Sequence, residues 1–187
     1  MTAIAYSYPH LAADSLITEA DKLACWLDKV RVVKASSGVW LLTGTGDWSD
    51  ISTWFDWIEG RLNCNGSMTD GIPAMPDAMG IAVSPTGDYY EYSSGKMTGP
   101  WRHENGWGYA HFLSGALDAG ASAAEAVRLA CCRVVSCGGP IKVYKAGVGL
   151  VEVIPDQPKV VKMCGSYVDK PAAAVSSSGI EWNAKEE

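Results

Sequence analysis

The spacing of apolar residues changes near residue 51, and this change constrains the fold more than any other feature of the sequence. Before it, short β-prone runs with alternating side chains occupy residues 2–8, 29–33 and 39–43, with a further short strand at 11–13. After it, the apolar residues keep the i, i+3, i+4, i+7 spacing of an amphipathic helix. They are Ile51, Trp54, Phe55, Ile58 and Leu62. The sequence therefore predicts paired strands followed by a helix.

The rest of the chain repeats this order of strands and helices. The predicted elements are a hairpin at 79–83 and 89–92, two helices at about 109–119 and 122–134, and a last strand pair at 141–144 and 150–154. Ser122 and Glu125 have the spacing of a capping box at the start of the second of these helices. Strand pairs with segregated helices indicate an α+β domain, and two sheets sandwiched between helices fit the pattern.

Charge and composition argue against several classes of protein. The chain carries 15 Lys and Arg against 21 Asp and Glu, a net charge of −6, whereas a nucleic-acid binder normally has a basic face. Apolar residues make up 48% and charged residues 19%, which is the composition of a folded domain. No run approaches the roughly 18 apolar residues of a membrane span, and the first residues do not resemble a signal peptide. We expect a cytoplasmic protein.

The usual metal, cofactor and hydrolase motifs are absent or incomplete. His103 and His111 are eight residues apart, whereas the zinc-binding helix motif needs a spacing of about four, and the six cysteines form no CxxC pair. The segment 44–46 follows a strand and precedes a helix, but Ser49 stands where a dinucleotide loop has its third glycine. No GxSxG elbow occurs. We expect reduced, structural cysteines and neither a metal nor a cofactor.

The strongest candidate for chemistry is the start of the chain. Removal of Met1, which is usual before a small residue, would expose Thr2. A free α-amine has a pKa of about 7.7–8.0, so it is poised to accept the proton of the hydroxyl on its own residue. Such a nucleophile needs a nearby cation and an acid that holds this cation. Lys29 and Asp14 are available, although spacing alone does not select them.

Several motifs resemble the N-terminal nucleophile hydrolases of the proteasome β-subunit and HslV type, and most closely the proteasome-like proteins of phages and prophages. The motifs occur in the family's order over roughly residues 2–154. They are Thr2-Ala-Ile-Ala-Tyr6, Leu11-Ala-Ala-Asp14-Ser15, Lys29-Val30, Thr43-Gly-Thr-Gly-Asp47, Asp118-Ala-Gly-Ala-Ser-Ala-Ala-Glu-Ala-Val127 and Gly138-Gly-Pro-Ile141.

This resemblance implies a four-layer αββα sandwich that assembles into a homo-oligomer, a ring or a spiral, and hydrolyses a peptide or small amide through an acyl-enzyme. By position, Thr2 would be nucleophile and base, Lys29 would lower the pKa of its hydroxyl, and Asp14 would orient Lys29. A backbone N–H near Gly44 or Thr45, in the turn after the preceding strand, would bind the oxyanion. The resemblance leaves any ATPase partner open. A phage-encoded protein would act in the cytoplasm of its bacterial host.

Some supporting positions depart from the family pattern. Asn105 stands where the family has a serine that supports the terminal amine, Cys137 replaces a hydroxyl residue, and Val134 replaces an acidic one. Asn105 and Cys137 can still form hydrogen bonds, whereas the Val134 side chain cannot. Two hypotheses therefore stay open: a threonine-type amide hydrolase, and a catalytically silent scaffold or partner-binding oligomer. A retained Met1 would favour the second, because Thr2 would then have no free amine.

The composition changes after residue 154. Residues 155–187 are rich in Pro, Ala, Ser and Lys, with the runs Ala172-Ala-Ala174 and Ser176-Ser-Ser178. We therefore predict one domain over 1–154 and a C-terminal extension over 155–187, either a loose tail or an oligomer contact.

Overall fold

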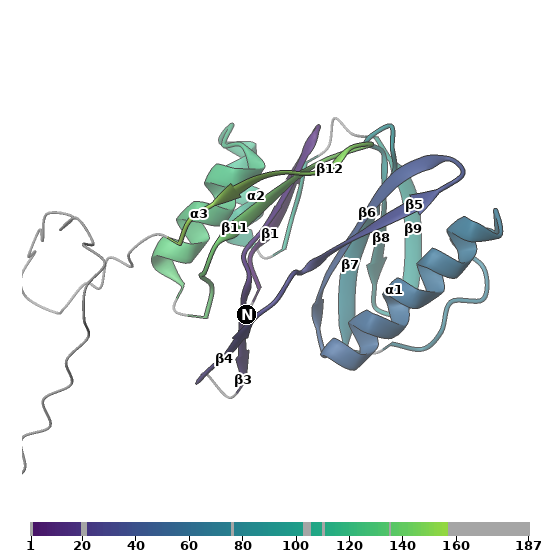
Figure 1. The fold of residues 1–187 in the computed structure, drawn as a ribbon, viewed down its shortest axis with the longest axis horizontal. Helices are drawn as coiled ribbons and strands as arrows, with labels where there is room; N and C mark the ends of the chain where they lie inside the picture. Colours follow the sequence, from purple (N-terminus) through teal and green to yellow (C-terminus); the bar gives the residue numbers. More distant parts are fainter. Residues whose placement is uncertain are drawn as a thin grey trace, which may run out of the picture.

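The computed structural model describes residues 2–19, 22–75, 77–102, 106–109, 111–134 and 136–156. Within these residues the chain is an α+β protein of antiparallel sheets and helices, as the sequence predicts (Figure 1). Met1, Asn105 and the extension beyond residue 156 lie outside the described residues. Among the described helices, none is long and apolar enough to cross a membrane.

One sheet brings together strands from the beginning and the end of the domain, in the order β10-β1-β2-β11-β12. Its strands are β1 (Ile4–Ser7), β2 (His10–Ala13), β10 (Trp107–Gly108), β11 (Ile141–Lys145) and β12 (Gly149–Ile154). The central strand β2 places Ala12 opposite Ala5 on one side and Val143 on the other. All three side chains belong to one apolar core, so this face of the sheet is built from small and branched residues.

The second five-stranded sheet is a meander in which each strand pairs with its neighbour in sequence. Its strands are β5 (Val30–Ala35), β6 (Gly38–Gly46), β7 (Ala78–Val83), β8 (Tyr89–Ser93) and β9 (Lys96–Trp101). A separate hairpin, β3 (Leu16–Glu19) with β4 (Lys22–Trp26), connects β2 of the first sheet to β5 of the meander. In Figure 1 this hairpin projects beside the N-terminus, below the first sheet.

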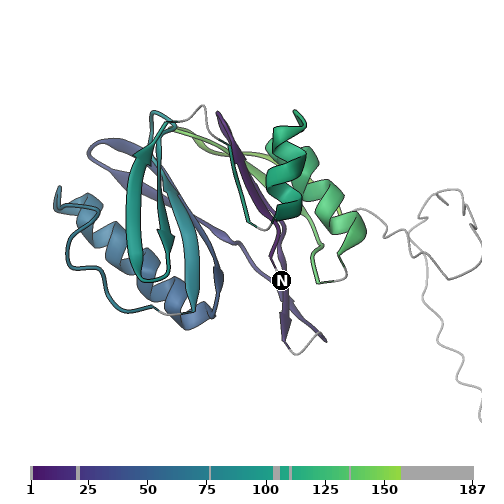
Figure 2. The ribbon, with the colours of Figure 1, turned by 180° about the vertical axis from the view of Figure 1, so that it is seen from behind.

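The helices lie on the outer faces of the two sheets, as Figures 1 and 2 show from opposite sides. They are α1 (Trp48–Asn63), α2 (His111–Asp118) and α3 (Ala123–Arg133). Asp47 caps α1 by accepting the backbone N–H groups of Ser49 and Asp50. Ser122 and Glu125 form the predicted capping box of α3, so this prediction is confirmed.

Three apolar cores hold these elements together. The five apolar residues predicted on one face of α1 are all buried, and they pack against the meander. A second core joins α2 and α3 to the first sheet, with Ala126 and Val127 among its fully buried residues. The third core contains Ile4 and Leu11 of the first sheet and Leu41 of the meander, so the inner faces of the two sheets pack against each other.

The structure contains strands that the sequence pattern did not predict. The β3–β4 hairpin was not expected, and no strand was predicted at the positions of β9 and β10. Pro100 is tolerated in β9 because β9 is an edge strand, where a missing N–H costs little. The two-residue strand β10 is defined only by its pairing with Ala5 and Tyr6 of β1. No local pattern identifies such a strand.

Candidate functional site

A buried ion pair connects the end of β2 in the first sheet to the start of β5 in the meander. Asp14 directly follows β2, and Lys29 directly precedes β5, with the β3–β4 hairpin between them. The Lys29 Nζ lies 2.7 Å from the Asp14 Oδ1, and the two side chains are 3% and 0% exposed. The hairpin returns the chain to its starting point, which explains how residues 15 positions apart come into contact. Two charges this deeply buried are stable in the core only as a hydrogen-bonded pair.

The Asp14 carboxylate also fixes the start of the chain. The backbone N–H of Ala3 donates to Oδ1 of Asp14 at 2.9 Å, and the N–H of Asp14 donates to the carbonyl of Ala3 at 3.0 Å. Oδ2 of Asp14 accepts the N–H of Gly138 at 3.0 Å. The carboxylate thus has three donors, and one of them belongs to the residue after Thr2. Thr2 itself is half-buried at the entrance to β1.

The segment 137–140 closes over Asp14 from the side of α3. The carbonyl of Gly138 accepts the N–H groups of Ser15 and Leu16, and the Ser15 hydroxyl donates to the carbonyl of Pro140 at 2.9 Å. Gly139 has a φ of +75°, and a β-carbon on it would lie 2.1 Å from the Trp26 ring. Only glycine fits there, because both the backbone conformation and the space exclude a side chain.

Gly44 and Thr45 lie inside β6, which differs from the turn that the sequence predicted for them. They pair with Gly80 and Met79 of β7, and the strand continues through Gly46. The positive φ of +124° occurs at Gly46, where a β-carbon would collide with the carbonyl of Asp77. The chain therefore turns towards α1 after residue 46. Thr43, the residue before Gly44, donates its hydroxyl to the carbonyl of Lys29 at 2.9 Å and so links β6 to the ion pair.

Cys137 and Val134 lie on the helical side of this site. Cys137 is buried in the core beneath α2 and α3, and Val134 packs against the same core. Cys131 was not predicted near the site, but its thiol interacts electrostatically with Asp14 and Lys29. Burial, followed by the negative charge of Asp14, raises the pKa of the Cys131 thiol to about 12. Asn105, the fourth supporting residue predicted from the sequence, lies outside the described residues.

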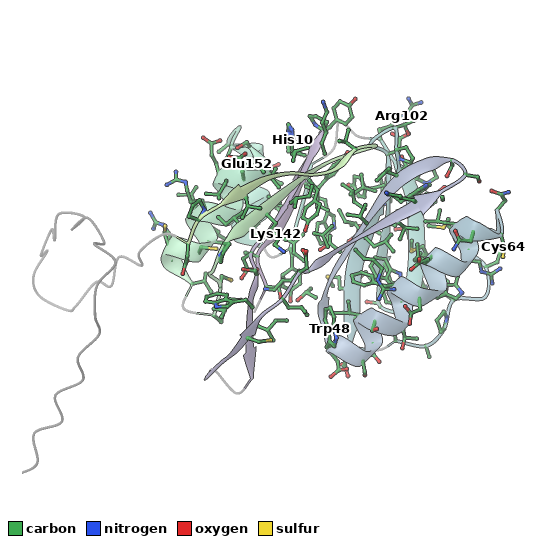
Figure 3. All side chains as sticks on the ribbon, in the orientation of Figure 1. His10, Trp48, Cys64, Arg102, Lys142 and Glu152 are labelled. Carbon is green, nitrogen blue, oxygen red and sulfur yellow. The ribbon has the colours of Figure 1, made fainter. Side chains whose placement is uncertain are left out.

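A second polar cluster, which no sequence motif indicated, lies next to Lys29. Asp28 accepts hydrogen bonds from Lys142, whose Nζ is 2.7 Å away, and from the Tyr144 hydroxyl. Both partners belong to β11, and Lys142 is labelled in Figure 3. Burial and the contact with Asp28 raise the pKa of Tyr144. The cluster ties β11 to the residue before Lys29. No group of three or more metal-binding side chains occurs in the part of the chain described here.

The arrangement of sheets and helices was compared with known structures. One neighbour is a Gly-1 mutant from Hyphomicrobium sp. strain MC1, with a TM-score of 0.59 and 12% identity over 82% of this chain and 86% of that chain. A second neighbour comes from the same strain, with a TM-score of 0.54 and 11% identity over 83% and 87% of the two chains. Both are Anbu. Anbu is a proteasome-like protein, so the chain has a proteasome-related fold.

These findings correct the relationship inferred from short motifs. The closest resemblance was expected to be with phage and prophage proteins, but the two structural neighbours described above are Anbu from Hyphomicrobium. No family model and no curated protein matches the sequence. At 11–12% identity the Anbu likeness shows the fold alone. Motifs of a few residues reflect turns and strand ends that many proteins of one fold share, so they do not separate one branch from another.

Proposed function

We propose that this protein is a threonine-type amide hydrolase in which Thr2, freed by removal of Met1, is the nucleophile. The observation that carries the proposal is the buried pair of Lys29 and Asp14, which is hydrogen-bonded to Ala3, the residue after Thr2. A buried lysine held beside the chain start is the cation that a terminal threonine needs. The substrate is a peptide or a small amide.

Each residue of the proposed site has a chemical role. The Thr2 hydroxyl attacks the substrate carbonyl while its proton moves to the α-amine of the same residue. The positive charge of Lys29 favours the developing alkoxide, and Asp14 holds Lys29 in place. Backbone N–H groups at Gly44 or Thr45 stabilise the oxyanion of the tetrahedral intermediate. The amine then protonates the leaving group, and water hydrolyses the resulting ester to restore Thr2.

The proposed architecture is the four-layer αββα sandwich of N-terminal nucleophile hydrolases. It is supported by the packing of the two sheets against each other, by the helices on their outer faces, and by the likeness to Anbu. We assign this domain to residues 1–154 and treat 155–187 as an extension. We further propose that the protein acts as a cytoplasmic homo-oligomer.

A second candidate is a catalytically silent scaffold with the same fold. It is favoured by the apolar surroundings of Val134 and Cys137, which stand where the family that the motifs resemble has polar groups. In that case the pair of Asp14 and Lys29 would serve stability alone. The two candidates differ in whether Thr2 reacts, not in the fold.

Hydrolysis assays with matched variants distinguish the candidates. We would follow a panel of fluorogenic peptide amides with the wild type, Thr2→Ala and Thr2→Ser. The hydrolase proposal predicts turnover in the wild type, partial turnover in Thr2→Ser and none in Thr2→Ala, with equal thermal stability in all three. Equal turnover in wild type and Thr2→Ala would reject Thr2 as the nucleophile.

A further inference from the structure

A cleft of about 470 Å³ lies between the meander and the outer edge of the first sheet. Met79 and Glu91 line it from β7 and β8, while Trp107, Gly108, Tyr109 and Ser114 line it from β10 and the start of α2. Trp107 belongs to the core between the sheets, and Tyr109 packs against that core. The cleft therefore has aromatic side chains on one wall and a carboxylate on the other.

The carboxylate of Glu91 faces the cleft because of the alternation of side chains along β8. Tyr90 and Tyr92 point to the α1 side, where they belong to or pack against the core beneath α1. Tyr89 and Glu91 therefore point inwards, towards the first sheet. Tyr89 is buried there, and burial followed by the charge of Glu91 raises the pKa of its hydroxyl. Glu91 is half-buried on this inner face.

Glu91 has no partner for its charge in the structure as described. No hydrogen bond or ion pair joins it to another described residue, and none of the described residues lining the cleft is Lys, Arg or His. Every other carboxylate discussed above has a donor, as Asp14 and Asp28 do. A half-buried carboxylate without a partner gains when a cation binds beside it, because the charge is already partly removed from water.

Two contacts connect the residues that line the cleft to the candidate site. The N–H of Tyr109 donates to the carbonyl of Ile4 at 3.0 Å, only two residues after Thr2. On the other wall, Met79 is the pairing partner of Thr45, one of the proposed oxyanion-binding positions. A peptide whose carbonyl lies between Thr2 and Thr45 would therefore have one of its side chains directed at this cleft.

We propose that the cleft binds the cationic side chain of a peptide substrate, the ammonium of lysine or the guanidinium of arginine, through Glu91. This inference rests on the proposed function and names its substrate class. Glu91 forms a charge-assisted hydrogen bond with the bound cation. Trp107 and Tyr109 supply the aromatic faces that attract cations in a partly desolvated site. Norleucine, which keeps the four-carbon chain of lysine but lacks the ammonium, lacks both interactions.

Binding without catalysis tests the inference separately from hydrolysis. In the full-length Thr2→Ala variant, tryptophan fluorescence would follow titration with N-acetyl-leucyl-lysine amide, with its norleucine analogue and with its glutamate analogue. We expect the lysine peptide to bind at least about tenfold more tightly than the norleucine peptide, and the glutamate peptide to bind most weakly. Adding Glu91→Gln should remove the preference for lysine, and Glu91→Asp should restore part of it.

Glu152→Gln is the matched control, because it makes the same change on β12, in a different cleft that it shares with His10. Figure 3 labels Glu152 and His10. An unchanged lysine preference in Glu91→Gln, or an equal loss in Glu152→Gln, would overturn the inference. If lysine binding depends on Glu91 but the wild type hydrolyses nothing, the site stands and the proposed function fails. If hydrolysis depends on Thr2 while lysine and norleucine peptides bind equally, only the inference fails.

Discussion

Replacing Asp14 by asparagine removes the counter-charge of Lys29 while it keeps the shape of the side chain. The ammonium of Lys29 would then be buried without a partner, because its side chain is only 3% exposed. Leaving one member of a buried pair uncompensated costs about 3–5 kcal/mol. Asparagine also replaces one acceptor oxygen by an NH2 group, which is a donor. One of the three present donors, such as the Gly138 N–H, would then lose its acceptor. This unmade hydrogen bond adds roughly 1–3 kcal/mol.

The expected loss is therefore about 4 kcal/mol or more, a large share of the roughly 5–15 kcal/mol that stabilises a typical domain. Lys29→Met should cost less, because Asp14 keeps two backbone donors, from Ala3 and Gly138. The double variant Asp14→Asn/Lys29→Met should be more stable than Asp14→Asn alone, since no buried charge remains. Urea denaturation of the four proteins gives the coupling free energy between the two sites.

An exposed pair provides the control for this cycle. Asp56 contacts Arg31 on the surface of α1 and its side chain is 70% exposed, so Asp56→Asn should change the free energy of unfolding by no more than about 0.5 kcal/mol. If Asp14→Asn is equally mild, or if the effects of Asp14→Asn and Lys29→Met simply add, then the two charges are not coupled in the folded protein. Asp14 would then not hold Lys29 in place through its charge.

Two further predictions concern the surroundings of the pair. Gly139→Ala and Gly120→Ala both place a β-carbon at a positive φ, at a cost of about 1–2 kcal/mol. Gly139→Ala should lower the free energy of unfolding further, because its β-carbon meets Trp26 while that of Gly120 meets nothing within 4 Å; equal urea midpoints would contradict the packing described. At pH 8, a thiol reagent should modify the exposed Cys25 and Cys64 but reach Cys131 only after unfolding, since the pKa of Cys131 is raised to about 12. Because the folded thiol keeps a proton that the unfolded thiol loses above its ordinary pKa near 9.0, stability should fall as the pH rises from there towards 12, and less so in Cys131→Ala. Rapid labelling of Cys131 in the native protein would refute this.

The predictions that succeeded depend on local signals. The five apolar residues of α1 repeat at helical spacing. Ser122 and Glu125 form the capping box of α3 within four residues. Both signals can be seen in the sequence and are found in the structure. The extent of β6 could not be seen locally. Its continuation through Thr45 depends on pairing with Met79, which lies 34 positions later.

The candidate site depends on contacts between residues that are distant in sequence, and the spacing of apolar residues does not reveal such contacts. Asp14 meets Lys29 only because the β3–β4 hairpin reverses the chain between them, and the spacing of residues does not reveal this hairpin. The resemblance to a known family selected this pair, whereas the residues alone left it open. Glu91 gave no signal at all, because an inward-facing glutamate on a strand is recognisable only when the partners of that strand are known.

The central claim is that Thr2 is a reactive terminal nucleophile, and an intact mass spectrum after incubation with a peptide β-lactone tests it most directly. The account predicts a protein that has lost Met1 and carries one adduct, mapped to Thr2, with no adduct in Thr2→Ala and a strongly slowed reaction in Lys29→Met. A protein that retains Met1 and takes up no label would contradict the account and leave a silent scaffold of the same fold.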